Sequence, residues 1–230
     1  MIVAAAVCPS PPLLIPALTG PSGGAADPLR EACATAVRAV LDQQPDLMVV
    51  VGPASSTATW PANSHLDLSR FAPQQNSNAQ SSLPLSLGIG GMLLDTAGFD
   101  GSRLLQSVAN DESASTCDNL GTKFGTMSER LGLLVMADGT ARRNRKAPGY
   151  FDARCEHFDG QIEASLRSGN LQSLKATNQA LSLELMATGW PCWQVLAASM
   201  GSQIVVSNLT YSDDPFGVYY LVAHLVPSRS

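Results

Sequence analysis

An apolar run over 2–7 passes directly into the proline-rich segment Cys8-Pro9-Ser10-Pro11-Pro12 at the start of the chain. Proline fixes φ and lacks a backbone donor, so this segment cannot continue as a helix. The pattern predicts a buried strand that ends in a stiff loop, with the side chain of Ser10 at the strand's carboxyl edge. In open α/β sheets ligands usually bind at that edge.

Two further apolar runs, 47–51 and 131–136, are typical of strands covered on both faces of a largely parallel sheet. Each ends in a polar turn, at 52–56 and 137–142 respectively. A helix predicted over 28–44 joins the first two strands as a βαβ unit. We therefore expect the three strand-end loops to face one pocket.

The chain of 230 residues is 45% hydrophobic and only 14% charged, without a convincing break in composition. This predicts a single α/β domain over 1–230, with a mostly parallel or mixed central sheet and helices on both faces. The net charge of −5 argues against nucleic-acid binding. A surface with so few charges also favours a homodimer, in which apolar patches are covered.

The apolar start of the chain resembles a signal peptide only superficially. No basic residue precedes it and prolines interrupt it, so we expect a core strand and no membrane segment. The five cysteines are odd in number and widely spaced, which fits reduced thiols in a cytoplasmic protein.

Other segments give further expectations. Leu83, Leu85 and Leu87 alternate as in a strand, and the glycines after them predict a turn into a short helix over 92–97. The uncharged stretch 72–82 predicts a mobile loop. Further helices are expected over 118–130, 151–167, 171–188 and 193–200, with Gly189 as a C-cap, and strands or short elements over 104–109, 204–209 and 218–226.

Seven short segments then carry a resemblance. They are 9–16, 49–54, 83–88, 138–141, 148–150, 158–159 and 213–217. In this order they resemble the subunit-B superfamily of class III extradiol ring-cleavage dioxygenases. The resemblance implies an extradiol dioxygenase-like fold.

In that family two histidines and a carboxylate hold a ferrous ion, and a third histidine acts as acid and base. Imidazole and carboxylate ligands suit Fe(II). Here Ser10 and Ala54 stand at the positions of the metal-binding histidines, Ala141 at that of the acid–base histidine, and Glu184 is a loose match to the carboxylate. The resemblance therefore implies a degenerate member with no metal, no cofactor and no catalytic residues. The chain's three histidines, His65, His157 and His224, have no metal-site spacing.

The strand-end loops still carry polar side chains that could bind a ligand. The candidates are Ser10, Ser55, Ser56, Asp138, Thr140, Arg142, Arg143 and Asp214. Arg142 and Arg143 would clamp a carboxylate or phosphate, or belong to a solvated loop without a ligand. Our main hypothesis is a non-catalytic or repurposed homologue that binds a small anionic or aromatic ligand. Two alternatives stay open: an enzyme with metal-independent chemistry in the same cleft, and a protein-interaction or scaffolding homo-oligomer.

Overall fold

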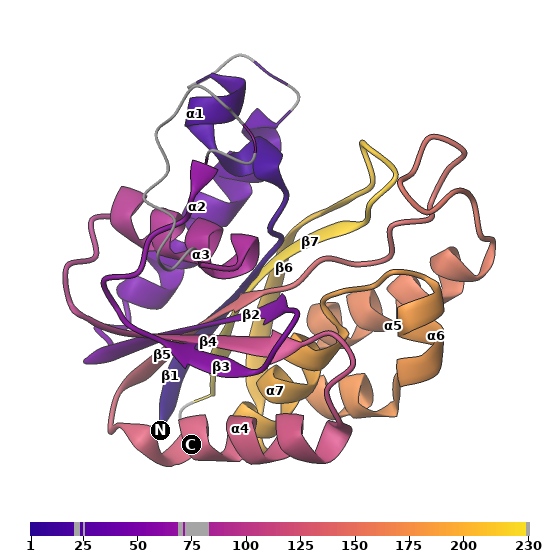
Figure 1. The fold of residues 1–230 in the computed structure, drawn as a ribbon. Coiled ribbons are helices and arrows are strands. Elements are labelled where there is room, and N and C mark those ends of the chain that lie inside the picture. The colour runs from indigo at the N-terminus through magenta and orange to yellow at the C-terminus, as the bar shows by residue number, and fades with distance from the viewer. Residues whose placement is uncertain (21–23, 25, 69–70, 72–82, 229–230) are drawn as a thin grey trace.

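The three apolar runs form the centre of a seven-stranded mixed sheet (Figure 1). The strands are β1 (Ile2–Cys8), β2 (Leu47–Ala54), β3 (Ala58–Trp60), β4 (Ser102–Ala109), β5 (Leu131–Met136), β6 (Val205–Asp213) and β7 (Tyr220–Pro227), in the order β3-β4-β2-β5-β1-β7-β6. The pairs β4–β2, β2–β5 and β5–β1 are parallel, whereas β3, β7 and β6 pair antiparallel with their neighbours. The carboxyl ends of β1, β2 and β5 consequently lie together at one edge.

This computed structural model describes residues 1–20, 24, 26–68, 71 and 83–228. The predicted mobile loop over 72–82 lies outside the described residues. No helix among these residues has the length and apolar character needed to cross a membrane.

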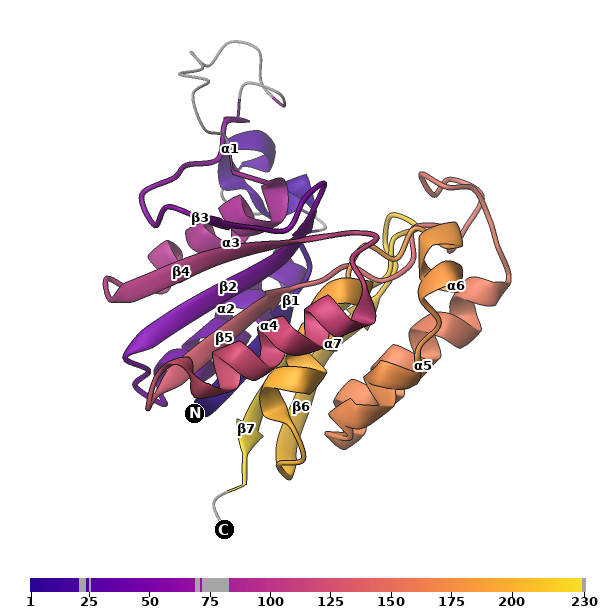
Figure 2. The same cartoon turned by 60° about the horizontal axis from the view of Figure 1, so that its bottom comes forward.

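Helices cover both faces of the sheet (Figures 1 and 2). They are α1 (Pro16–Thr19), α2 (Asp27–Leu41), α3 (Leu85–Thr96), α4 (Ala114–Met127), α5 (Arg154–Ser168), α6 (Gln179–Glu184) and α7 (Trp190–Met200), with 3-10 turns at Pro12–Leu14 and Leu171–Ala176. Helices α2 and α3 pack on one face, and α4, α5 and α7 pack on the other. The architecture is the single α/β domain that the sequence predicts.

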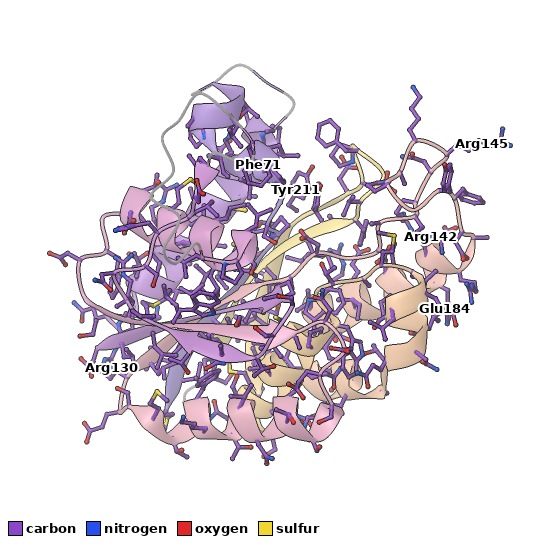
Figure 3. The ribbon with its side chains drawn as sticks, viewed as in Figure 1. Phe71, Arg130, Arg142, Arg145, Glu184 and Tyr211 are labelled. Carbon is purple, nitrogen blue, oxygen red and sulfur yellow. The ribbon has the colours of Figure 1, made fainter. Side chains whose placement is uncertain are left out.

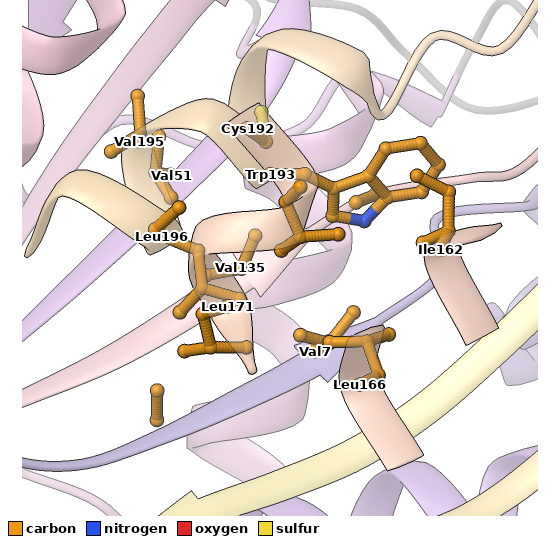
Figure 4. Close-up of a cluster of buried hydrophobic side chains, with 14 of the residues drawn as sticks. Val7, Val51, Val135, Ile162, Leu166, Leu171, Cys192, Trp193, Val195 and Leu196 are labelled. Atoms are coloured by element: carbon orange, nitrogen blue, oxygen red, sulfur yellow. The ribbon is translucent and has the colours of Figure 1, made fainter. Parts of the chain in front are cut away.

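Alternating side chains of the central strands enter two separate cores. Val7, Val51 and Val135 pack against α5 and α7 around the buried Trp193 (Figure 4). Their neighbours along the same strands, among them Ala6 and Val50, pack against α2 and α3. Burial on both faces explains why these strands are continuous apolar runs without alternation.

The strand predicted over 83–87 is wrong, because Leu85 begins helix α3. The helix is favoured by its close packing against β2, which the alternating leucines at 83, 85 and 87 do not predict. A side chain at Gly90 would come within 2.5 Å of Val50 Cγ1, so the bare backbone lets the helix lie close against β2. Gly90 therefore serves helix–sheet contact rather than a turn.

The single helix predicted over 171–188 is also wrong. The chain forms a 3-10 turn at Leu171–Ala176 and then the short helix α6, whose N-cap Asn178 accepts from the backbone N–H of Leu181. Gly189 is the N-cap residue of α7 and not a C-cap. The helical spacing of apolar residues continues across Asn178, so the sequence pattern did not predict that the helix is interrupted there.

Candidate ligand site at the carboxyl edge of the parallel strands

The loops after β1, β2 and β5 enclose a cavity of about 480 Å³. Its polar lining includes Ser10, Ser55, Ser56, Ser86, Asn110 and Asp138, and its apolar lining includes Trp60, Leu66, Phe71 and Leu85. Ser10 follows β1, Ser55 and Ser56 follow β2, and Asp138 follows β5. Because these strands are neighbours and run in the same direction, the expected convergence of the three loops on one pocket is confirmed.

Ser10 and Asp138 form the best-defined contact in this cavity. The backbone N–H of Ser10 donates to Asp138 Oδ1 at 2.9 Å, and its hydroxyl donates to Oδ2 at 3.0 Å. Removal from water raises the pKa of the Asp138 carboxyl, while the two hydrogen bonds from Ser10 lower it. The burial effect is the larger, so the pKa lies above its usual value.

The opposite side of the cavity depends on a close approach between α3 and β2. Ser86, in the first turn of α3, donates its hydroxyl to the backbone carbonyl of Pro53 at 2.8 Å. A side chain at Gly52 would lie 2.5 Å from Ser86 Oγ, so this contact requires glycine at the end of β2. The result is a second buried serine at the cavity.

Aromatic side chains form part of the wall. The indole N–H of Trp60 donates to Ser107 Oγ at 2.9 Å, which fixes the ring beside the cavity. The Ser107 hydroxyl in turn lies 2.8 Å from the carbonyl of Ser56 and ties the loop after β2 to β4. Phe71 contributes a second ring that is partly exposed.

Thr140, Arg143 and Asp214 do not line this cavity but join a separate network. Thr140 donates its backbone N–H and its hydroxyl to the buried Asp159, at 3.0 and 2.6 Å. Arg143 donates to Asp214 at 2.7 Å, lies 3.7 Å from Asp159, and stacks over Tyr219. Burial raises the pKa of Asp159 to about 6, although hydrogen bonds from Thr140 and the charge of Arg143 oppose the rise.

Arg142 is also committed to the protein itself. Its guanidinium donates to the carbonyl oxygens of Gly149 and Glu184, at 2.5 and 2.8 Å. Figure 3 shows Arg142 and Glu184 beside α5 and α6, far from Phe71 at the cavity. The two arginines therefore do not form the predicted anion clamp at the cavity. Instead, both stabilise the 138–150 loop through contacts within the protein.

The residues at the strand edge do not fit a ferrous ion. The hydroxyl of Ser10 is bonded to Asp138, and Ala54 offers only a methyl group. Ala141 lies outside the lining, and the Glu184 carboxylate forms an ion pair with Arg154 at 2.7 Å. Among the described residues no group of three His, Cys, Asp or Glu side chains could hold a metal ion.

The histidines lie elsewhere. His65 lines a neighbouring cavity of about 470 Å³ that is bounded by α3. His157 is exposed on α5 within 3.3 Å of Gln161, and His224 lies in β7 opposite Ala6. None of the three lines the strand-edge cavity.

The sequence did not identify several residues of this site, among them Ser86, Trp60 and Asn110. Ser86 and Trp60 were not identified because they come from segments that reach the cavity only through chain folding, and Asn110 because it follows β4, whose role was undefined. The one available signal was topological: Asn110 directly follows the apolar stretch 104–109, as Ser10 follows the first strand.

Fold and cavity together define a mixed-sheet α/β protein with a ligand-sized cavity at the carboxyl ends of its parallel strands. No protein-family model and no curated protein matches the sequence. The chain is similar in structure to an uncharacterized protein, JW3007, from Escherichia coli K12, known from a crystal structure. The TM-score is 0.56 at 13% identity, over 97% of this chain and 99% of that one. At this identity the similarity concerns the fold alone.

Proposed function

We propose that this protein is a non-catalytic relative of the extradiol ring-cleavage dioxygenases that binds a small aromatic molecule in the strand-edge cavity. One observation supports the proposal. Ser10 and Ala54, at which the resemblance implies metal-binding histidines, both line the cavity, and Trp60 and Phe71 lie in its wall.

The dimensions support a small-molecule ligand. Binding sites for such ligands usually have volumes of roughly 300–1,000 Å³, with apolar and aromatic walls and a few placed polar groups. The cavity of about 480 Å³ has Trp60 and Phe71 in its wall and Ser10, Ser86 and Asp138 as buried or half-buried polar groups. Aromatic rings pack favourably against other rings in offset or edge-to-face arrangements.

The structure gives less support to an anionic ligand, the other ligand class in our hypothesis. Arg142 donates to backbone carbonyls and Arg143 to carboxylates, and neither lines the cavity. An anion would have to break these contacts before it could use either guanidinium. We therefore favour an aromatic ligand over a phosphate or carboxylate.

A thermal-shift screen with small monocyclic aromatic compounds tests the proposal. A compound that binds only the folded state raises Tm, by an amount set by its concentration relative to Kd. Ala54→Phe should abolish the shift because the added ring fills the cavity. Ala114→Phe, on the exposed start of α4, is the matched control and should leave the shift intact.

A second measurement tests the non-catalytic part. Catechol incubated with the protein and added Fe(II) should give no ring-opened product above the rate with Fe(II) alone. A protein-dependent product, or stoichiometric iron retained after desalting, would show that an iron site exists and would overturn the proposal.

A further inference from the structure

We infer that the ligand of this cavity is an arylalkylammonium, whose ring packs beside Trp60 and Phe71 and whose cationic N–H groups point at Ser10, Ser86 and Asp138. This inference rests on the proposed function and specifies the ligand's chemical class. We call these three residues the acceptor floor, because the direction of their hydrogen bonds leaves them able only to accept.

The proton of the Ser86 hydroxyl is already committed. Its partner is the carbonyl oxygen of Pro53, which cannot donate, so Ser86 must be the donor in this 2.8 Å contact. The lone pairs of Ser86 Oγ are left to accept from a ligand. Ser86 is 3% exposed and cannot turn without losing this bond.

The Ser10 hydroxyl is committed in the same way. It donates to Asp138 Oδ2 while the Ser10 backbone N–H occupies Oδ1. With both donors of Ser10 directed at one carboxylate, its hydroxyl oxygen also presents lone pairs only. A ligand that reaches Ser10 therefore has to bring the hydrogen.

The third member, Asp138, adds negative charge. Each oxygen of its carboxylate accepts one bond from Ser10 and has further accepting capacity. The described residues that line the cavity include this carboxylate and no Lys, Arg or His. A carboxylate or phosphate ligand would face lone pairs and like charge, both of which disfavour binding.

An ammonium group satisfies this arrangement. It carries three N–H donors and no acceptor, which matches three acceptors on the floor. Bonds from an ammonium to a carboxylate are charge-assisted and about twice as strong as neutral ones. A hydroxyl group has one donor, so a neutral alcohol can satisfy only part of the floor.

Three probes of similar shape separate these chemistries: 2-phenylethylammonium, 2-phenylethanol and 3-phenylpropionate. Calorimetry at pH 7 should rank the ammonium first, the alcohol second and the carboxylate last, with at least about a tenfold difference in Kd between first and last. Butylammonium, which lacks the ring, should bind more weakly than 2-phenylethylammonium.

Variants test which residue makes the distinction. Asp138→Asn removes the charge with little change of shape, so the ammonium and carboxylate probes should then differ in Kd by no more than about threefold. Asp100→Asn, an exposed site away from the cavity, should keep the original ranking. If Asp138→Asn does not fold, the ranking on the unaltered protein decides alone.

The outcomes are distinct. If 3-phenylpropionate binds as tightly as the ammonium, or if Asp100→Asn erases the ranking as Asp138→Asn does, the acceptor floor is not the selecting element and this inference is overturned. Binding of the aromatic probes would still support the proposed function. If none of the three ring compounds binds, the proposed function falls together with the inference.

Discussion

Ser10 and Asp138, 128 positions apart in the chain, are joined by two hydrogen bonds that link the loop after β1 to the loop after β5. A backbone N–H and a hydroxyl of one residue hold both oxygens of a single carboxylate. This pair fixes the position of the carboxylate at the cavity.

Ser10→Ala should destabilise the protein by about 1–2 kcal/mol at pH 7, because it removes one hydrogen bond to a charged group with little water around it. Ser55→Ala, an exposed position on the same cavity, should change stability by less than about 0.5 kcal/mol. Urea denaturation of both variants gives the comparison. If Ser10→Ala and Ser55→Ala changed the free energy of unfolding equally, the hydrogen bond between Ser10 and Asp138 would not contribute to stability.

The two neighbouring glycines Gly90 and Gly91 should respond oppositely to alanine. At Gly90 the added methyl would meet Val50 Cγ1 at 2.5 Å and Met136 Sδ at 3.1 Å, so Gly90→Ala should cost about 1–3 kcal/mol. At Gly91 the methyl meets nothing within 4 Å, so Gly91→Ala should gain up to about 1 kcal/mol from helix propensity. Thermal unfolding of the two variants decides, and a stable Gly90→Ala protein would contradict the packing of α3 on β2.

Arg143→Ala should destabilise the protein strongly because it leaves two carboxylates, Asp159 and Asp214, without this cation. The expected loss is roughly 2–4 kcal/mol at pH 7, since Asp159 is buried. Arg145→Ala, on the exposed part of the same loop, should be nearly neutral. Neither variant should alter binding of an aromatic ligand in the cavity; a lost ligand shift in Arg143→Ala at a temperature where it is folded would restore the predicted anion clamp.

The raised pKa of Asp159 predicts the direction in which the stability of the protein changes with pH. The folded state holds this proton more tightly than the unfolded chain, so the contribution of Asp159 to stability is greatest below about pH 4 and falls as pH rises to about 6. The difference between the folded and unfolded pKa of Asp159 corresponds to roughly 3 kcal/mol. Glu112 and Glu163, whose pKa values are lowered, contribute with the opposite sign.

The measurement therefore compares the protein with Asp159→Asn, which cannot ionise. The free energy of unfolding of the unaltered protein, relative to that of the variant, should decline between pH 4 and pH 6. Two parallel curves would show that Asp159 ionises in the folded state as it does in the unfolded one.

Chelation should leave stability unchanged. The strand edge presents a serine hydroxyl and a methyl group at the two positions where the resemblance implies imidazoles, so no folding free energy should come from metal binding. Dialysis against a chelator should shift Tm by less than about 1 °C, whereas a structural metal contributes several kcal/mol. A clear drop in Tm that added Fe(II) or Zn(II) reverses would contradict this.

The amino-acid sequence determined the sheet's centre. Uninterrupted apolar runs at 2–7, 47–51 and 131–136 must be buried on both faces, which requires a parallel core covered by helices on each side. The polar residues that end these runs could therefore be placed at one edge, and Ser10, Ser55, Ser56 and Asp138 do meet there.

Tertiary structure alone decided which polar side chains face the cavity. Asp138 and Thr140 lie two positions apart in the same loop, yet one borders the cavity and the other bonds the buried Asp159 of α5. The arginines were ambiguous for the same reason, since their partners, Glu184 and Asp214, are brought to them by distant segments. A local pattern records polarity and period, but the partner of a hydrogen bond or ion pair depends on where the rest of the chain folds.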